Sequence, residues 1–377
     1  MPVDWERVRG EFPSLANCTF LNTATYGQTP RRAYEAVERH FARRTERACM
    51  DFLDWFDDAD RIRESLGRLI GCAADDIAFL PTASASLSLL VNGIDWAPGD
   101  RVVTLENEFP NNLYFPALLR ERGVEFVETT WDGFYQAVTS RTRLVALSSV
   151  NYTTGLRPPV EEVSRFLRQR GVLFFLDGTQ SVGVLRMNVR EIEPSMVAVD
   201  AYKWMLTPNG AGFVYVDPKV RRWLSPQVIG WRSHHDWRSV DSLHQGLPQM
   251  TDKAERYEGG MLPFPMIYAM GAVTDWMLEI GPEIIERRAL ALAHLLRDRL
   301  RAEGVELLSD QRDLYSSSIV SARLQGRDAS EAARMLRHRG IYVSARHGLL
   351  RTSVHFYNNE GDLERLGDEL RNIAAGF

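Results

Sequence analysis

The order of apolar and polar stretches between residues 60 and 216 predicts helices that alternate with strands. Stretches with helical periodicity, most of which stop at a glycine, are 61–71, 86–94, 111–123 and 160–171. Short apolar runs that predict strands are 77–80, 101–106, 124–130, 142–150, 172–177, 196–200 and 211–216. This alternation is typical of a mostly parallel sheet with right-handed crossovers, and the continuous apolar run 172–176 fits a strand buried on both faces.

After residue 217 the pattern changes. Residues 231–250 show no period and predict a long loop, whereas helices are predicted near 264–280 and 282–303. The remainder, 304–377, reads as strand, strand, helix, strand, strand, helix. The predicted fold class is α/β, with a large domain over 21–255, interdomain helices and a small C-terminal α+β domain over 256–377, and an N-terminal segment, 1–20, that packs on the small domain.

Composition narrows the class of protein. The chain has 377 residues and a net charge of -5, so it lacks the electrostatic footprint of a protein that binds nucleic acid or an anionic membrane. No apolar run reaches the roughly 18 residues that a spanning helix needs, and the N-terminus has no signal-peptide core, so we expect a cytoplasmic protein. Three scattered cysteines without a CxxC pair, and the adjacent His234 and His235 without a carboxylate pattern, predict neither a disulfide framework nor a metal site.

A carboxylate follows the predicted strand 172–177. Asp177 comes directly after five apolar residues, and ligands of parallel sheets bind beyond the carboxyl ends of the strands. A buried ionised carboxylate is costly unless it meets a positive partner. The carboxylate of Asp177 could pair with an arginine of the protein, cap the turn that follows, or bind a ligand. Gln180, in the same loop, could reach the same planar ligand.

A lysine, Lys203, stands among apolar and aromatic residues in "VDAYKWM" (199–205). Most lysines are solvated surface groups. An amine in a poorly hydrated site has a lowered pKa and becomes a nucleophile that forms Schiff bases with aldehydes.

The third feature is the stretch "FLPTASASLSLL" (79–90), which predicts a strand, a turn of small residues and a helix start. Free amides at a helix N-terminus form an anion site, and Ala83 and Ser84 allow close approach of the backbone. Ordinary helix capping by Thr82 or Ser84 is the alternative. Taken together, an anion site, a carboxylate and a reactive amine describe pyridoxal 5′-phosphate (PLP), a cofactor with a phosphate, a pyridine nitrogen and an aldehyde.

Two motifs carry a resemblance to a known family. They are D-x-x-Q-x-x-G at 177–183 and K-W-x-x-x-P-x-G-x-G at 203–212. With them, the chain from "FLNTATYGQTP" (20–30) to "LRTSVHFYNNEGDLERL" (350–366) resembles the class V aminotransferase and cysteine desulfurase-like group of fold-type I PLP-dependent enzymes. The resemblance implies the fold-type I architecture, in which a large PLP-binding domain with a mostly parallel sheet precedes a small C-terminal domain.

The resemblance also implies roles around the cofactor ring. Lys203 is implied as the Schiff-base lysine and Asp177 as the partner of the pyridine nitrogen. Gln180 and Asn151 are implied to contact the phenolic oxygen. Phe109 takes the ring-stacking place, where many members carry a histidine; an aromatic face stacks with about 1 kcal/mol but cannot carry protons.

At the phosphate end, the resemblance implies binding by Ala83 and Ser84, and by Tyr202 in place of the usual histidine. The family's Ser-x-His-Lys is Asp-Ala-Tyr-Lys here, and because Asp200 beside a phosphate dianion carries a penalty, we expect it to orient Tyr202, an arginine or a water. The stretch "RYEGG" (256–260) resembles one that reaches the neighbouring subunit's phosphate, which implies a homodimer with shared sites and a backbone contact at Gly260.

On the substrate side, Arg351 matches the arginine that binds an α-carboxylate in the family, with a surface ion pair as the alternative. Asn22 and Tyr26 lie in the segment that lines the family's substrate mouth. His347 precedes Arg351 and either faces the substrate or lies on the surface.

The function predicted from this resemblance is a class V aminotransferase that acts on an amino acid or amine through a Schiff base at Lys203. A β-eliminating C–S lyase or an isopenicillin N epimerase-like enzyme is the alternative. The loop 342–353 lacks the cysteine that a desulfurase needs, which argues against that activity. A PLP-binding protein without turnover would be expected to lack Lys203 or Arg351, and this chain has both. A Rossmann dehydrogenase would carry G-x-G-x-x-G after its first strand, and this chain does not.

Overall fold

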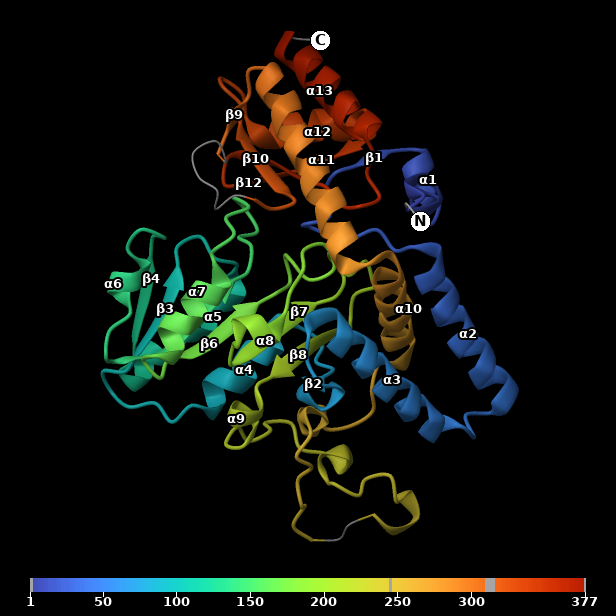
Figure 1. Cartoon of the computed structure of the whole chain (residues 1–377), viewed down its shortest axis with the longest axis vertical. Coiled ribbons are helices and arrows are strands. Elements are labelled where there is room, and N and C mark those ends of the chain that lie inside the picture. The colour runs from blue at the N-terminus through green and yellow to red at the C-terminus, as the bar shows by residue number, and fades with distance from the viewer. Residues whose placement is uncertain (1–2, 244–245, 309–315, 376–377) are drawn as a thin grey trace.

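The computed structural model describes residues 3–243, 246–308 and 316–375 (Figure 1). Its centre is a seven-stranded sheet with the strand order β2-β8-β7-β6-β5-β3-β4. The strands are β2 (Ile77–Ala78), β3 (Arg101–Leu105), β4 (Glu125–Thr129), β5 (Thr142–Ser148), β6 (Leu173–Asp177), β7 (Met196–Asp200) and β8 (Gly212–Val216). The pairs from β7 to β4 are parallel, and β8 runs antiparallel to both of its neighbours. The α/β fold class and the mostly parallel sheet are therefore confirmed.

Helices cover both faces of this sheet (Figure 1). The helices of this part are α2 (Arg31–Arg47), α3 (Phe52–Ile70), α4 (Ala83–Gly93), α5 (Pro110–Leu118), α6 (Phe134–Ala137), α7 (Val160–Arg168), α8 (Val189–Ile192) and α9 (Pro218–Arg221). Successive residues of β6 enter different cores: Phe174 and Leu176 pack in the core beneath α3 and α7, and Phe175 packs in the core beneath α4. Burial on both faces explains why this strand reads as a continuous apolar run.

The C-terminal part forms a second body above the sheet (Figure 1). Its elements are α11 (Pro282–Ala302), β9 (Glu306–Leu307), β10 (Ile319–Arg323), α12 (Ala329–His338), β11 (Ile341–Tyr342), β12 (Ser344–Arg346), β13 (Leu349–Ser353) and α13 (Glu360–Ala375). Four of these strands form a sheet in the order β12-β13-β10-β9 with antiparallel neighbours. Between α12 and α13 the described chain has three short strands, where the sequence predicted two. The extra strand is β11, which pairs with β1 (Thr19–Phe20), whereas β12 and β13 form a hairpin that turns at His347 and Gly348, both with positive φ.

The N-terminal segment contacts this second body. Arg9, the last residue of helix α1 (Trp5–Arg9), donates two hydrogen bonds of 2.8 and 3.1 Å to the carboxylate of Asp362. Strand β1 (Thr19–Phe20) pairs in parallel with β11. The predicted domain boundaries themselves stay predictions.

A long helix, α10 (Phe264–Ile280), packs along α2 and α3 and leads into α11 (Figure 1). The predicted loop 231–250 extends below the sheet and, where described, contains two short 3-10 turns, Trp231–Ser233 and Val240–Ser242. No helix in the described ranges is long and apolar enough to cross a membrane.

A buried ion cluster fastens the edge of the sheet. The side chain of Glu258 has no solvent exposure and lies 2.5 Å from the guanidinium groups of both Arg63 and Arg232, which are themselves buried. The other carboxylate contact is the amide of Phe79, at 2.8 Å. Phe79 precedes the turn that leads into α4, so this cluster fixes where that helix begins.

We expect the substitution Glu258→Ala to lower the free energy of unfolding by up to about 3–5 kcal/mol, because it removes the fully buried carboxylate that two buried guanidinium groups share. Arg63 then keeps only Asp60 and Arg232 only Glu255 as acidic partners among the described residues. Glu125→Ala is the matched control: its ion pair with Arg101 is half-exposed and is expected to contribute about 0–1 kcal/mol. Urea denaturation of both variants measures the difference. Equal losses of unfolding free energy in the two variants would show that the buried cluster stabilises the protein no more than an exposed ion pair does.

Candidate active site

A cavity opens at the carboxyl ends of three adjacent parallel strands. Ser148 ends β5, Asp177 ends β6 and Asp200 ends β7, and Ser148 lies directly opposite Asp177 in the strand register. The residues lining the cavity are Phe109, Asn111, Ser148, Tyr152, Asp177, Thr179, Gln180, Asp200 and Lys203. Parallel strands bring these side chains together because their carboxyl ends share one edge of the sheet.

Lys203 is buried, with 6% of its surface exposed. Its Nζ lies 5.1 Å from the ring centre of Phe109 and 5.6 Å from that of Tyr202. Within the described ranges this nitrogen makes no hydrogen bond and no ion pair. Burial lowers the pKa of Lys203 despite the opposing effect of two nearby carboxylates, so more of the amine is neutral and nucleophilic at pH 7.

The sequence contains only two other lysines, Lys219 and Lys253, and both are exposed. Lys203 is therefore the one lysine of this chain in an environment that favours the neutral amine.

Close backbone contacts hold the Lys203 segment in place. A Cβ on Gly27 would lie 1.9 Å from the carbonyl oxygen of Lys203, and the Gly27 amide donates to the Tyr202 carbonyl at 2.9 Å. On the other side, a Cβ on Gly183, whose φ is +101°, would lie 2.3 Å from the carbonyl oxygen of Trp204. Because the two glycines have no side chains, the neighbouring segments pack directly against the backbone at Lys203 and Trp204. This packing limits the motion of that backbone.

Asp177 is buried at the end of β6. Its Oδ1 accepts a hydrogen bond from the Thr179 amide at 2.9 Å. Burial raises the pKa of Asp177, while Thr179 and the Lys203 ammonium lower it. A carboxylate held in this way can pair with a protonated ring nitrogen.

Asp200 binds a group that the sequence analysis did not name. Its Oδ1 accepts a hydrogen bond of 2.7 Å from the amide of Ala83, the first residue of α4, and the expected role in orienting Tyr202, an arginine or a water stays a prediction. The physical reason is that a buried carboxylate needs a donor and the helix N-terminus supplies one. Burial, and then the charge of Asp177, raise the pKa of Asp200 to about 6.

The remaining predicted ring contacts divide into two groups. Gln180 lines the cavity, where its amide donates to the Ala24 carbonyl at 3.1 Å and accepts from Trp204 Nε1 at 2.7 Å. Asn151 lies outside the lining: its Oδ1 accepts the amides of Thr153 and Thr154, both at 2.9 Å. The implied role of both side chains at the phenolic oxygen stays a prediction.

The predicted phosphate residues surround the N-terminus of α4 rather than the cavity lining. The hydroxyl of Ser84 donates to Asn111 Oδ1 at 2.6 Å. Burial raises the pKa of Tyr202 to about 12, so its phenol stays neutral. Gly260 is outside the lining too, and its amide donates to the Glu258 carbonyl at 2.9 Å.

Arg351, on β13, is 1% exposed and meets only neutral acceptors. Its guanidinium donates to Ser344 Oγ at 3.0 Å, to the Tyr152 carbonyl at 2.6 Å and to Thr25 Oγ1. Among the described residues it forms no ion pair. Burial, and then Arg346, lower the pKa of Arg351 to about 9, which leaves it protonated at pH 7. A buried cation without an acidic partner is costly, so an anionic ligand that binds beside it would be stabilised.

The residues predicted at the substrate mouth lie near Arg351 or near the Lys203 segment. The Thr25 hydroxyl that accepts from Arg351 donates to Asn22 Oδ1 at 2.8 Å. The exposed Tyr26 packs against Tyr202 with ring centres 5.1 Å apart and ring planes tilted by 43°. The structure thus connects Asn22 to Arg351 through Thr25, and Tyr26 to the Lys203 segment.

His347 is exposed, and its Nε2 lies 2.9 Å from the hydroxyl of Tyr152. The ring of Tyr152 in turn packs edge-on against Phe109, with ring centres 5.2 Å apart. The sequence analysis missed Tyr152, Thr25 and Arg346. Their only sequence signals are positions beside Asn151, beside Tyr26 and five residues before Arg351.

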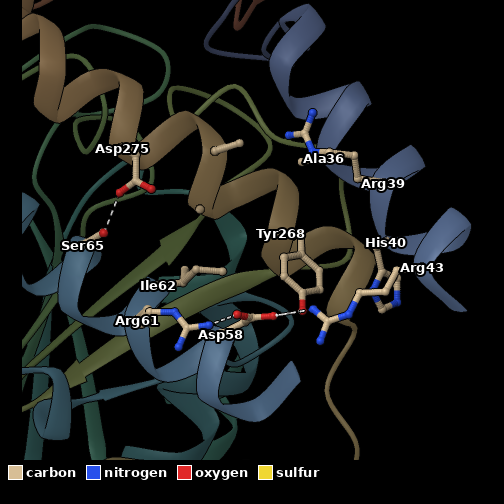
Figure 2. A pocket seen from close by; sticks show the side chains of 12 residues that line it. Ala36, Arg39, His40, Arg43, Asp58, Arg61, Ile62, Ser65, Tyr268 and Asp275 are labelled. Carbon is tan, nitrogen blue, oxygen red and sulfur yellow. Dashed lines mark hydrogen bonds and ion pairs between the residues drawn. The ribbon is translucent and has the colours of Figure 1, made fainter. Parts of the chain in front are cut away.

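A larger cavity between α2, α3 and α10 contains none of the predicted site residues (Figure 2). Among its charged residues, Asp58 binds Arg43, Arg61 and the hydroxyl of Tyr268, as Figure 2 shows. No group of histidine, cysteine or acidic side chains in the described ranges could hold a metal ion.

Comparisons with known proteins agree with this architecture. A family model described as aminotransferase class-V matches residues 22–366. A probable cysteine desulfurase of Methanothermobacter thermautotrophicus is 26% identical and covers 98% of both chains. An isopenicillin N epimerase of Streptomyces clavuligerus is 29% identical over 97% of this chain and 98% of its own.

A solved structure shows the same fold. A lysine-to-alanine variant of C-DES with glycine covalently linked to the PLP cofactor has a TM-score of 0.90 and 20% identity, and covers 99% of this chain and 100% of its own. C-DES is named a cystine C–S lyase in a further solved structure. The fold-type I architecture is confirmed.

The cavity fits PLP, the cofactor that enzymes of the matched family use. Lys203 offers a buried amine without a partner to an aldehyde, and Asp177 offers a carboxylate to a ring nitrogen. Phe109 offers an aromatic face 5.1 Å from that amine. The N-terminus of α4 offers amides to a phosphate, although Asp200 already accepts one of them.

Sodium borohydride treatment of PLP-loaded protein should fix the cofactor on Lys203 alone, because Lys203 lines the cavity, whereas Lys219 and Lys253 are exposed and lie outside its lining. Peptide mapping by mass spectrometry identifies the labelled lysine. The Lys203→Ala variant should carry no label, whereas a variant with both Lys219→Arg and Lys253→Arg should label as the wild type does. Label on either exposed lysine in the wild type would contradict the assignment.

Proposed function

The chain belongs to the class V aminotransferase family of PLP-dependent enzymes, and on that premise we propose that it transfers the amino group of an α-amino acid. The observation that carries the proposal is the buried guanidinium of Arg351, which has no acidic partner among the described residues. Arg351 donates to the carbonyl of Tyr152, a residue that lines the cavity together with Lys203. This is the arrangement that an amino acid needs, with its carboxylate on the cation and its amine at the cofactor.

The cofactor, when bound, supplies an electron sink for the pair of electrons left at Cα when a proton is removed. Asp177 would pair with the ring nitrogen through a charge-assisted hydrogen bond and keep it protonated. Lys203 would remove and return protons at Cα, because burial lowers its pKa and favours the neutral amine. Arg351 would orient the substrate, and Phe109 would offer an aromatic face to the ring.

Cysteine desulfurase activity is not proposed, because Cys18, Cys49 and Cys72 all lie outside the loop 342–353 that precedes and contains Arg351. A thiolate nucleophile would have to come from this loop to reach the substrate.

A second candidate is a C–S lyase or an amino-acid epimerase. It is favoured by the pair formed by Tyr152 and His347, which adds an acid–base group beside Phe109 and the Arg351 contact. An epimerase needs a proton donor other than Lys203 for the opposite face of Cα, and a lyase needs an acid for the leaving group. A phenol hydrogen-bonded to an imidazole can serve either purpose.

We also propose a homodimer. Val228 and Met261 are 63% and 58% exposed and border a groove that reaches Pro81, beside the N-terminus of α4. Exposed apolar side chains in one patch are typical of a surface that a partner covers. Gly260 lies next to this patch, where a partner chain would approach the phosphate end of the site.

We expect Arg351→Gln to lower kcat/KM for an α-amino acid by about 100-fold, since it removes the charge that binds the carboxylate. An amine that lacks the carboxylate should lose less than about threefold. Steady-state kinetics with an amino acid and its decarboxylated amine measure both. PLP loading and thermal unfolding serve as the controls for correct folding, and equal losses for the two substrates would remove the assigned role.

The reaction type is tested with a panel of L-amino acids, each incubated with and without a 2-oxo acid acceptor. Transamination should form the matching oxo acid only when the acceptor is present. Elimination should release pyruvate and ammonia without an acceptor, and epimerisation should form the D-enantiomer without one. Products formed without an acceptor would replace our proposal by the second candidate, and Tyr152→Phe should then slow them.

A further inference from the structure

The carboxylate of Asp200 holds the first amide of α4. Asp200 is 8% exposed, and its Oδ1 accepts from the Ala83 amide at 2.7 Å. The next residue but one, Ala85, donates its amide to the side chain of Thr82 at 3.1 Å. Two of the first three amides of this eleven-residue helix are therefore engaged by side chains of the chain itself.

A phosphate needs these same donors. The N-terminus of α4 adjoins the cavity, because Asp200 both lines the cavity and accepts the Ala83 amide. Amides and the helix dipole at this helix start favour the negative charge of the cofactor's phosphate. One amide cannot donate fully to two anions at once. Two negative charges a few ångströms apart in a partly buried site repel strongly, so a carboxylate beside the phosphate carries a large cost.

The surroundings of Asp200 make its neutral form accessible. From the end of β6, the charge of Asp177 adds to burial and raises the pKa of Asp200 to about 6, while Lys203 lowers it. From its own loop, Tyr202 adds no charge at neutral pH, because burial raises its pKa to about 12. Helix α4 carries no titratable side chain over 83–93, and β8 places Gly212 opposite Asp200.

We propose that Asp200 competes with the phosphate group of PLP for the Ala83 amide, and that phosphate binding converts Asp200 to its neutral acid by uptake of one proton from solvent. The carboxyl group gives up the amide and becomes a hydrogen-bond donor that faces the phosphate. The affinity for PLP then falls as the pH rises above the range in which Asp200 protonates. This proposal rests on the cofactor and not on which reaction follows.

The test compares two probes, PLP and pyridoxal, which share the ring and the aldehyde and differ in the phosphate. Dissociation constants are measured by equilibrium dialysis from pH 6 to pH 8.5 for the wild type and for Asp200→Asn. The asparagine is neutral and keeps an oxygen for the Ala83 amide. The titration of the phosphate itself, with a second pKa near 6, affects both proteins equally and cancels in the comparison.

A carboxylate that must gain a proton weakens binding by up to about tenfold for each pH unit above its pKa. At pH 8 we expect Asp200→Asn to bind PLP at least about 30-fold more tightly than the wild type, with a pH dependence reduced by about tenfold per unit. Pyridoxal should bind to both proteins within about twofold, since it brings no phosphate to compete. Asp217→Asn is the matched control, because Asp217 caps α9 by the same kind of bond, at 2.7 Å to the Lys219 amide, outside the residues that line the cavity.

Equal PLP affinity in wild type and Asp200→Asn at pH 8, or an equal gain for pyridoxal, would overturn the proposal. Weaker PLP binding by the variant would do the same, since it would make Asp200 a required ligand. Asp200→Ser, which is also neutral, repeats the comparison if Asp200→Asn unfolds at a lower temperature than the wild type. If the wild type binds neither probe, the cofactor assignment fails and this proposal fails with it.

Discussion

The burial of charged groups at the carboxyl ends of β6 and β7 is the constraint on which the site depends. Asp177 and Asp200 end two neighbouring strands, and Lys203 follows three residues later with its amine directed into the same cavity. Each of these charges would be costly alone, and their mutual proximity offsets only part of that cost. The raised pKa values of the acids and the lowered pKa of the amine are the result, and they provide a base and an electrophile-binding amine at neutral pH.

The substrate end of the site is built by the other body of the protein. Arg351 comes from the C-terminal sheet, Tyr152 follows β5 of the central sheet, and Thr25 belongs to the N-terminal segment. One guanidinium joins all three because it can donate in several directions. The position of the carboxylate subsite therefore depends on how the two bodies pack, and a shift between them would move Arg351 relative to Lys203.

The relatives of this chain include proteins named cysteine desulfurase and isopenicillin N epimerase, and its fold is shared with a cystine C–S lyase. A shared fold does not fix which of these reactions occurs. Three features of this chain bear on our proposals: the absence of a cysteine from 342–353, the pair formed by Tyr152 and His347, and the aspartate bound to the first amide of α4. The first two bear on the proposed reaction and the third on the proposed binding of the cofactor's phosphate.

Sequence by itself determined the fold class, the alternation of helices and strands, and the chemistry of the main groups. Local pattern was enough for this, because strand 173–177 is apolar on both faces and its final residue must lie at the sheet edge. It also supplied the motifs with Asp177, Lys203 and Arg351, because residue type and spacing within one segment can be read without knowing how the rest of the chain folds.

Tertiary structure alone decided which distant segments meet. No local pattern could place Thr25 against Arg351, bring the hydroxyl of Tyr152 to His347, or direct Asp200 to the Ala83 amide. Each of these contacts joins residues more than 100 positions apart in the chain. Hydrogen bonds of this kind are satisfied by whichever donor packing brings within about 3 Å, and that distance is set by the fold as a whole.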